Sequence, residues 1–298
     1  MSLATGDHLA KDGGPTAKEL VKELDWLLDD AVEACCGPGA QRCVAWRDLQ
    51  RCAAGRAASC TVALRLELQG LGQLWHQRLD QRAPLQYLCN LAHWRDVTLA
   101  VGPGVLIPRP ETELLVDFAQ EAQLQHPELR EGAWADLGTG SGALAIGLAS
   151  ILPQGSRVLA VDCSPAARAW AQLNVRRLGL SPVVEVIEGH WYSPLHQWQG
   201  QLCGVLSNPP YINSKQLPSL QAEIKLHEPS LALDGGCEEG AVCLREVCEG
   251  ATRMLRPGGF LAVETAGGSQ ADSLAAYVET LREQGDLAFK QVALHPVM

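Results

Sequence analysis

The first part of the chain carries apolar residues at the spacing of amphipathic helices. Thr16 and Glu19 form a capping-box pattern, which predicts a helix start. The apolar positions that follow at helical spacing are Leu20, Val21, Leu24, Leu27, Leu28 and Val32. Shorter helical pieces are predicted over Ala45–Ala58, and a longer helix near Thr61–Gln81. Residues 1–82 are therefore predicted to form an N-terminal helical bundle domain.

An alternating pattern replaces the helical spacing at residues 83–110. Apolar and polar residues alternate over Leu85–Leu88 and again over Val97–Val101, as they do in strands. Gly102-Pro103-Gly104 predicts a turn, and Ile107–Pro110 an extended stretch. We interpret this segment as a hairpin linker between two domains.

The remaining chain, residues 111–298, begins with a predicted helix and then alternates strands with helices. Strands are predicted over Ala133–Leu137, Arg157–Asp162, Val183–Glu188, Leu202–Ser207 and Phe260–Glu264. Helices are predicted over Glu111–Gln125, Ala143–Leu152, Pro165–Leu178 and Ala241–Leu255. This alternation predicts an α/β fold with a Rossmann-like, doubly wound, mostly parallel sheet, in which ligands bind beyond the carboxyl ends of the strands.

The composition and charge of the chain limit the classes of protein to which it could belong. The 298 residues are 47% hydrophobic and carry a net charge of −10, which disfavours a protein that mainly grips a phosphate backbone. The 11 cysteines include no C-x-x-C pair, so we expect reduced thiols and no metal site. No apolar run is long enough for a membrane span. Met1–Pro15 carries no targeting pattern, so we expect a cytoplasmic protein, or a plastid or mitochondrial one if a transit peptide is missing from the sequence.

A glycine-rich loop follows the first predicted strand of the sheet. It reads Asp136-Leu137-Gly138-Thr139-Gly140-Ser141-Gly142 and opens a helix, so that the backbone can approach a ligand closely. The loop lacks the Gly-Lys-Ser/Thr of a P-loop, which argues against a nucleoside triphosphate. Asp162 ends the next strand, where an acidic residue typically holds the two hydroxyls of a ribose.

A second motif, Ser207-Asn208-Pro209-Pro210-Tyr211, follows the fourth predicted strand. The prolines fix an extended backbone and leave the carbonyl oxygens before them free as acceptors. Asn208 adds a carboxamide, and Tyr211 a flat aromatic face. Acceptors beside an aromatic face suit a planar NH2 group, which can be bonded through both hydrogens and stacked.

These motifs together resemble the class I S-adenosylmethionine-dependent methyltransferases, and within them the HemK/PrmC family of peptide chain release factor N5-glutamine methyltransferases. The resemblance covers roughly residues 62–285 and rests on motifs whose spacing suits one fold. They are Pro84–Leu88, Val105–Glu113 with its Arg-Pro-Glu-Thr-Glu element, Asp136–Gly142, Asn208–Ile212, His227-Glu228-Pro229 and Leu255–Phe260.

The resemblance implies a role for each matching residue. Gly138, Thr139, Gly140, Ser141 and Gly142 would hold the methionine part of S-adenosyl-L-methionine, with Asp136 and Asn208 also contacting this cofactor. Asp162 would bond the ribose, and Trp191 would pack near the adenine. The catalytic residues would be Asn208, Pro209 and Tyr211, which with Pro210 would hold the substrate glutamine. Glu111 and Glu113 would brace this site.

The chain departs from the family pattern at a few positions. His190 and Cys203 each stand at a position where the family usually has Asp. Cys89-Asn90 stands where the family usually has a glycine. The family closes its sheet with two antiparallel strands, whereas this sequence has one further candidate strand near Ala288–Leu294. We therefore expect that strand to shift inward or the sheet to lack a strand.

The resulting hypothesis is an enzyme that methylates the side-chain nitrogen N5 of a glutamine in a protein, the Gly-Gly-Gln loop of peptide chain release factors. The helical domain would bind that partner, and we expect a monomer that contacts neither membranes nor nucleic acid directly. Two alternatives stay open. One is an adenine-N6 methyltransferase acting on DNA or RNA, because adenine presents a similar planar NH2 group. The other is a binding protein that keeps the cofactor fold without turnover.

Overall fold

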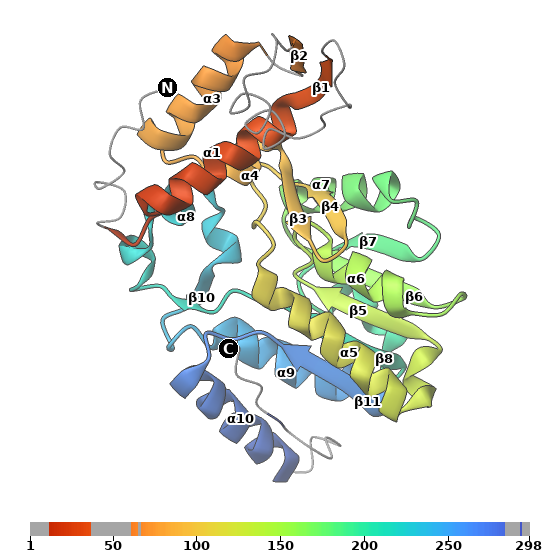
Figure 1. Ribbon diagram of the computed structural model, residues 1–298. Coiled ribbons are helices and arrows are strands. Elements are labelled where there is room, and N and C mark those ends of the chain that lie inside the picture. Colours follow the sequence, from red (N-terminus) through yellow and green to blue (C-terminus); the bar gives the residue numbers. More distant parts are fainter. Residues whose placement is uncertain (1–11, 37–60, 65–66, 284–292, 294–298) are drawn as a thin grey trace. The chain divides into compact units, whose positions relative to one another are not determined.

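The computed structural model describes residues 12–36, 61–64, 67–283 and 293 (Figure 1). The chain divides into two compact units. The first comprises residues up to Asn90 together with Ser219–His227, and the second comprises Leu91–Pro218 and the chain from Glu228 onward.

The second unit is built on a five-stranded parallel sheet with the strand order β11-β8-β5-β6-β7. The sheet strands are β5 (Ala133–Leu137), β6 (Arg157–Asp162), β7 (Val184–Glu188), β8 (Leu202–Ser207) and β11 (Leu255–Val263). Every residue of β5 and β8 is buried, because neighbouring strands and helices cover both strands. The shared register brings the ends of β5, β8 and β11 together, with Ser207 opposite both Leu137 and Val263.

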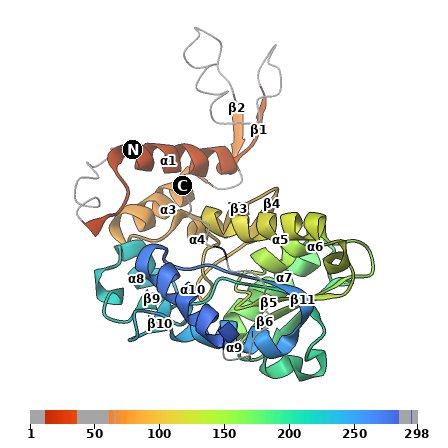
Figure 2. The ribbon, with the colours of Figure 1, turned by 90° about the horizontal axis from the view of Figure 1, so that it is seen from below.

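Helices cover both faces of this sheet. Figure 2 shows α5 and α6 on one side of the strands and α9 on the other. The α-helices of the unit are α5 (Glu113–Gln125), α6 (Ala143–Ile151), α7 (Pro165–Arg177), α9 (Val242–Met254) and α10 (Gly268–Glu283). Ser164 caps α7 by accepting a hydrogen bond from the backbone N–H of Ala167, which confirms the predicted start of that helix. The doubly wound parallel sheet predicted from the sequence is confirmed.

Two smaller β-elements complete the second unit. The hairpin of β3 (Leu91–Trp94) and β4 (Val97–Ala100) precedes the sheet. The short strands β9 (Ile212–Asn213) and β10 (Asp234–Gly236) pair in parallel beyond β8. The 3-10 turns are Pro110–Thr112, Pro127–Arg130, Ser193–Trp198, Leu217–Ser219 and Ser230–Ala232, of which the fourth ends in the first unit.

The first unit packs helices around a leucine-rich core. Its described elements are α1 (Ala17–Ala31), β1 (Val32–Cys36), β2 (Thr61–Leu64), α3 (Leu68–Asp80), α4 (Leu85–Cys89) and α8 (Ala222–His227). Leu20 and Leu27 of α1, Leu71 and Trp75 of α3, and Leu85 of α4 are all buried in one cluster. Of the apolar stripe predicted for this helix, Leu20, Leu24, Leu27 and Leu28 therefore belong to the core, whereas Val21 is exposed.

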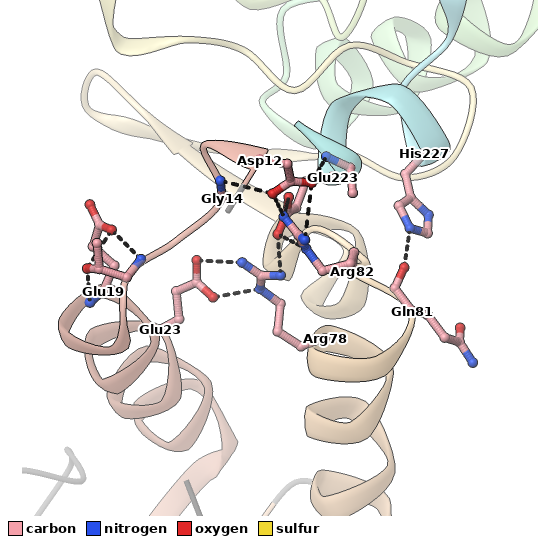
Figure 3. A network of polar contacts seen from close by, with 11 residues as sticks. Asp12, Gly14, Glu19, Glu23, Arg78, Gln81, Arg82, Glu223 and His227 are labelled. Atoms are coloured by element: carbon pink, nitrogen blue, oxygen red, sulfur yellow. Dashed lines mark hydrogen bonds and ion pairs between the residues drawn. The ribbon is translucent and has the colours of Figure 1, made fainter. Parts of the chain in front are cut away.

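A network of charged side chains joins α8 to the helices of the first unit (Figure 3). Arg78 is 2% exposed and pairs with Glu23 at 2.6 Å and with Glu223 at 2.9 Å. Arg82 pairs with the other oxygen of Glu223 at 2.6 Å and with Asp12 at 3.0 Å. Burial disfavours the charged form of Glu223, but hydrogen bonds from Arg82 and Arg78 hold its pKa below the ordinary value. The segment containing α8 is thereby fixed to the first unit.

Some sequence predictions are wrong in detail. Leu85–Cys89 forms a helix rather than a strand, ending at Asn90 in the left-handed conformation with φ of 54°. Asn tolerates this conformation, which explains how it replaces the glycine usual at this position. The helical stripe predicted to include Val32 ends at Ala31, and Thr61–Leu64 pairs as a strand with Val32–Cys36. The predictions for Ala45–Ala58 and Ala288–Leu294 fall almost entirely outside the described residues.

Candidate functional site

A cavity lies beyond the carboxyl ends of β5, β6 and β8 in the second unit. The sequence-predicted residues that line it are Gly138, Thr139, Gly140, Ser141, Asp162, Trp191, Asn208 and Pro210. Asp136, Gly142, Pro209 and Tyr211 are not among its lining residues. The parallel sheet thus brings the two predicted motifs and the acidic residue to one place, as expected for strands whose ends share an edge.

The glycine loop needs glycine at three positions. Gly138, Gly140 and Gly142 have φ angles of 73°, 56° and 85°, which side chains rarely tolerate. The backbone N–H groups of Gly138 and Thr139 both donate to the carbonyl of Val161, at 2.9 and 3.0 Å. This pair of bonds fastens the loop to the end of β6.

Asp136 supports the loop from below rather than lining the cavity. Its Oδ2 atom accepts from the Thr139 hydroxyl at 2.6 Å and from the backbone N–H of Ala145 at 2.9 Å. Its Oδ1 atom is buried and has no hydrogen-bond partner among the described residues. Burial raises the pKa of Asp136 to about 7, despite the two bonds that favour the carboxylate. An unsatisfied acceptor therefore sits beside the loop.

Asp162 ends β6 and faces the cavity. One of its oxygens accepts from the N–H of Gly140 at 2.9 Å and the other from the N–H of Ser164 at 2.8 Å. Burial raises its pKa, and these two bonds oppose the rise. A carboxylate offers about four lone-pair sites, so acceptor capacity remains for a ligand.

Trp191 supplies a flat wall of the cavity. Its backbone has φ of 47°, and its indole N–H donates to Glu246 at 2.7 Å. A side chain added at Gly138 would place its Cβ 3.4 Å from the Trp191 ring. The ring therefore lies against the glycine loop, and His190, which also lines the cavity, meets it edge-on with ring centroids 5.2 Å apart.

Asn208 is held by residues that the sequence analysis did not single out. Its Nδ2 atom donates to the Thr112 hydroxyl at 3.0 Å, and that hydroxyl donates to Glu264 Oε2 at 2.6 Å. The Tyr211 hydroxyl donates to Glu264 Oε1 at 3.1 Å. Burial raises the pKa of Tyr211, and the neighbouring Glu264 carboxylate raises it further, so the phenol stays protonated. Thr112 lines the cavity with Asn208.

Residues of the Arg-Pro-Glu-Thr-Glu and His-Glu-Pro motifs have definite partners, among them Glu113, one of the two residues expected to brace the site. Arg109 forms an ion pair with the buried carboxylate of Glu228 at 2.6 Å. Glu113 accepts from the backbone N–H of Arg95 at 2.9 Å. His227 lies in the first unit, where its Nε2 contacts the carbonyl of Gln81 at 2.8 Å. The ion pair and the Glu113 bond thus hold the segments that flank Thr112 and Pro229.

Comparison with known proteins assigns the family. Residues 112–235 match the family model described as methyltransferase small domain. A release factor glutamine methyltransferase of Synechocystis sp. is 38% identical over 276 residues, covering 92% of this chain and 85% of the relative. The chain belongs to the release factor glutamine methyltransferase family.

Further relatives carry the same name. The release factor glutamine methyltransferase of Thermosynechococcus vestitus is 46% identical over 203 residues, covering 68% of each chain. That of Gloeobacter violaceus is 47% identical over 206 residues, covering 69% of this chain and 70% of its own. The family and the class I methyltransferase fold implied by the sequence are confirmed, and this fold family in general depends on S-adenosylmethionine. Within the described part of the chain, the helices include none long and apolar enough to cross a membrane.

Proposed function

We propose that this protein transfers a methyl group from S-adenosylmethionine to the side-chain nitrogen N5 of a glutamine in the Gly-Gly-Gln loop of a peptide chain release factor. The observation that carries the proposal is the Asn208 carboxamide, which lines the cavity beside the glycine loop with Nδ2 engaged by Thr112. The Oδ1 atom is then free to accept from a second amide. The names of the family relatives support the substrate class.

The residues of the cavity fit the cofactor. Asp136, whose Oδ1 has no partner among the described residues, lies behind the loop that lines the cavity, and its negative charge would attract the cationic amino group that the methionine part of S-adenosylmethionine carries. Asp162 retains acceptor capacity for two ribose hydroxyls. The Trp191 ring offers a face for adenine. The loop Gly138–Gly142 lets the backbone approach the ligand without side-chain obstruction.

The residues around Asn208 would assist the methylation of an amide nitrogen, which reacts poorly by itself. When bound, S-adenosylmethionine supplies an electrophilic methyl group on a positively charged sulfur. An amide nitrogen is a weak nucleophile because its lone pair is delocalised into the carbonyl. Asn208 Oδ1 and the carbonyl of Pro209 would accept the two N–H groups, fix the nitrogen and stabilise the positive charge that develops on it. The new carbon–nitrogen bond would form as the methyl–sulfur bond breaks, with that bond's electron pair going to the sulfur, which leaves as a neutral thioether. One N–H proton of the methylated nitrogen would then leave to solvent.

We assign partner recognition to the helical first unit. It contains α8, whose flanking chain leads on one side to Asn208–Tyr211 and on the other to Glu228. A release factor bound to this unit would therefore engage a segment continuous with the substrate motif. Trypsin protection of the first unit by an added release factor would test this assignment.

The direct test is mass spectrometry of a Gly-Gly-Gln loop peptide, and of an intact release factor, after incubation with the protein and S-adenosylmethionine. We expect a mass increase of one methylene located on the glutamine side chain. Duplex DNA and single-stranded RNA serve as parallel substrates, and methylation there with none on the glutamine would favour the adenine-N6 alternative. Absence of a thermal stabilisation by saturating cofactor would favour the non-catalytic alternative.

A further inference from the structure

A chain of hydrogen bonds lies at the inner edge of the cavity. Its members are Thr112, just before α5, Asn208 and Tyr211 after β8, and Glu264, the residue after β11. Glu264 is fixed in place because its backbone N–H donates to the carbonyl of Ser207 at 3.0 Å. The sheet therefore holds the carboxylate next to the Asn208 motif, although Glu264 itself does not line the cavity.

The chemistry of these groups sets the direction of each bond. An ionised carboxylate only accepts, so the single hydroxyl proton of Thr112 is committed to Glu264. The Thr112 oxygen can then only accept from Asn208, which must present Nδ2 to it. The carboxamide oxygen consequently faces away from Thr112.

We propose that Glu264 is a positioning residue for methyl transfer, whose carboxylate acts through Thr112 to hold the Asn208 carboxamide with its oxygen available to the substrate amide. This inference rests on the proposed function. It adds a role for two residues, Glu264 and Thr112, beyond those that contact the substrate. The same carboxylate accepts from Tyr211 and so also fixes the phenol that follows the two prolines.

Protonation of Glu264 would undo the arrangement. A neutral carboxyl can donate to Thr112, whose own proton is then free to turn toward Asn208 and to favour the flipped carboxamide. Burial raises the pKa of Glu264, and the nearby Glu111 raises it further, whereas bonds from Thr112 and Tyr211 and the charge of Arg109 lower it. We therefore expect kcat to fall as the pH drops through the raised pKa of this group.

The experiment compares kcat and KM of the full chain with those of Glu264→Gln, Thr112→Val and Thr112→Ser, using a Gly-Gly-Gln peptide. We expect Glu264→Gln and Thr112→Val to lower kcat on the order of a hundredfold with KM for the cofactor little changed, and Thr112→Ser to restore most of the rate. The acidic limb of the kcat profile should disappear in Glu264→Gln. Glu249→Gln is the matched control, because Glu249 of α9 also accepts from a tyrosine, Tyr277 of α10, but does not line the cavity.

A second measurement does not depend on turnover. The side-chain amide resonances of Asn208 in ¹⁵N-labelled protein, assigned by their loss in Asn208→Ala, should move with pH in the wild type and stay constant in Glu264→Gln. Wild-type kcat in Glu264→Gln, or an acidic limb that persists in it, would overturn the inference. Asn208 amide resonances that respond to pH in the same way in the wild type and in Glu264→Gln would also overturn the inference. No glutamine methylation by the wild type, with the resonances responding as expected, would instead refute the proposed function.

Discussion

The substitution Asp136→Asn tests what the buried carboxyl beneath the glycine loop does for stability and for ligand binding. Asp136 is fully buried, and its Oδ2 accepts two hydrogen bonds, while its Oδ1 accepts none from the part of the chain that the structure describes. An asparagine keeps an oxygen for the bonds from Thr139 and Ala145 and removes the buried charge. We expect a more stable protein at alkaline pH that binds the cofactor less tightly.

The magnitude follows from the pKa. Burial raises the pKa of Asp136 from 3.8 to about 7. Between these two values the folded protein keeps a proton that the unfolded chain has already released, so the free energy of unfolding falls as the pH rises. A difference of about three pKa units corresponds to about 4 kcal/mol. Asp136→Asn avoids this loss of stability. Its stability advantage over the wild type is absent at pH values below the lower pKa and complete at pH values above the higher pKa.

The assay is urea unfolding of the full chain without cofactor, followed by tryptophan fluorescence at about pH 4 and about pH 8. The stability difference between Asp136→Asn and the wild type should grow by up to about 4 kcal/mol across this range. Asp117→Asn is the control, since it makes the same change of side chain at an exposed ion pair with Arg95, where such pairs contribute little to stability. Calorimetric titration with S-adenosylmethionine should show weaker binding to Asp136→Asn alone.

Two results would refute this reasoning. A stability difference that is the same at both pH values would mean that the folded protein carries the charge at no cost. Unchanged cofactor affinity in Asp136→Asn would mean that the unpartnered oxygen does not serve the ligand, and that Asp136 only supports the loop through Thr139 and Ala145.

Three further substitutions test other parts of the structure. Asn208→Ala should raise the activation free energy by about 3 kcal/mol while calorimetric cofactor affinity stays near the wild-type value; affinity falling in parallel with rate would contradict its assignment to the substrate. Arg78→Met should lower the free energy of unfolding by about 3 kcal/mol, because the buried carboxylate of Glu223 and the half-buried one of Glu23 lose a partner, whereas Arg282→Met at an exposed pair should cost less than about 1 kcal/mol. Gly204→Ala would place a Cβ 2.2 Å from the buried Trp134 ring and should cost about 1–3 kcal/mol in urea unfolding; wild-type stability would show that β8 adapts easily.

The sequence predicted the parts of the fold that local patterns determine. The bounds of β5, β6 and β8 match the predicted strands, because each is a short buried run that ends at a loop or motif residue. Leu85–Leu88 was predicted wrongly as a strand because its apolar residues, Leu85, Tyr87 and Leu88, suit a strand or a single helical turn equally. The distinguishing signals were the neighbours: Pro84 before the first turn, and Asn90 in the left-handed conformation after the last.

The residues of the candidate site also fall into a group that the sequence predicted and a group that it did not. The glycine loop, Asp162 and Asn208 are each visible as the end of one strand, and the rule that ligands lie beyond such ends groups them without knowledge of the register. The sequence analysis missed Glu264 because the predicted last strand included this residue. Its side chain was therefore expected to lie within the sheet. The structure ends β11 at Val263 and pairs that residue with Ser207, so the next residue reaches the site. Glu264 and Thr112 are 152 residues apart in the chain, and the bonds that join them to Asn208 and Tyr211 exist only because β11 and β8 lie side by side. The groups proposed to bind ligand therefore follow from motifs, whereas the groups proposed to orient them follow from strand order and register.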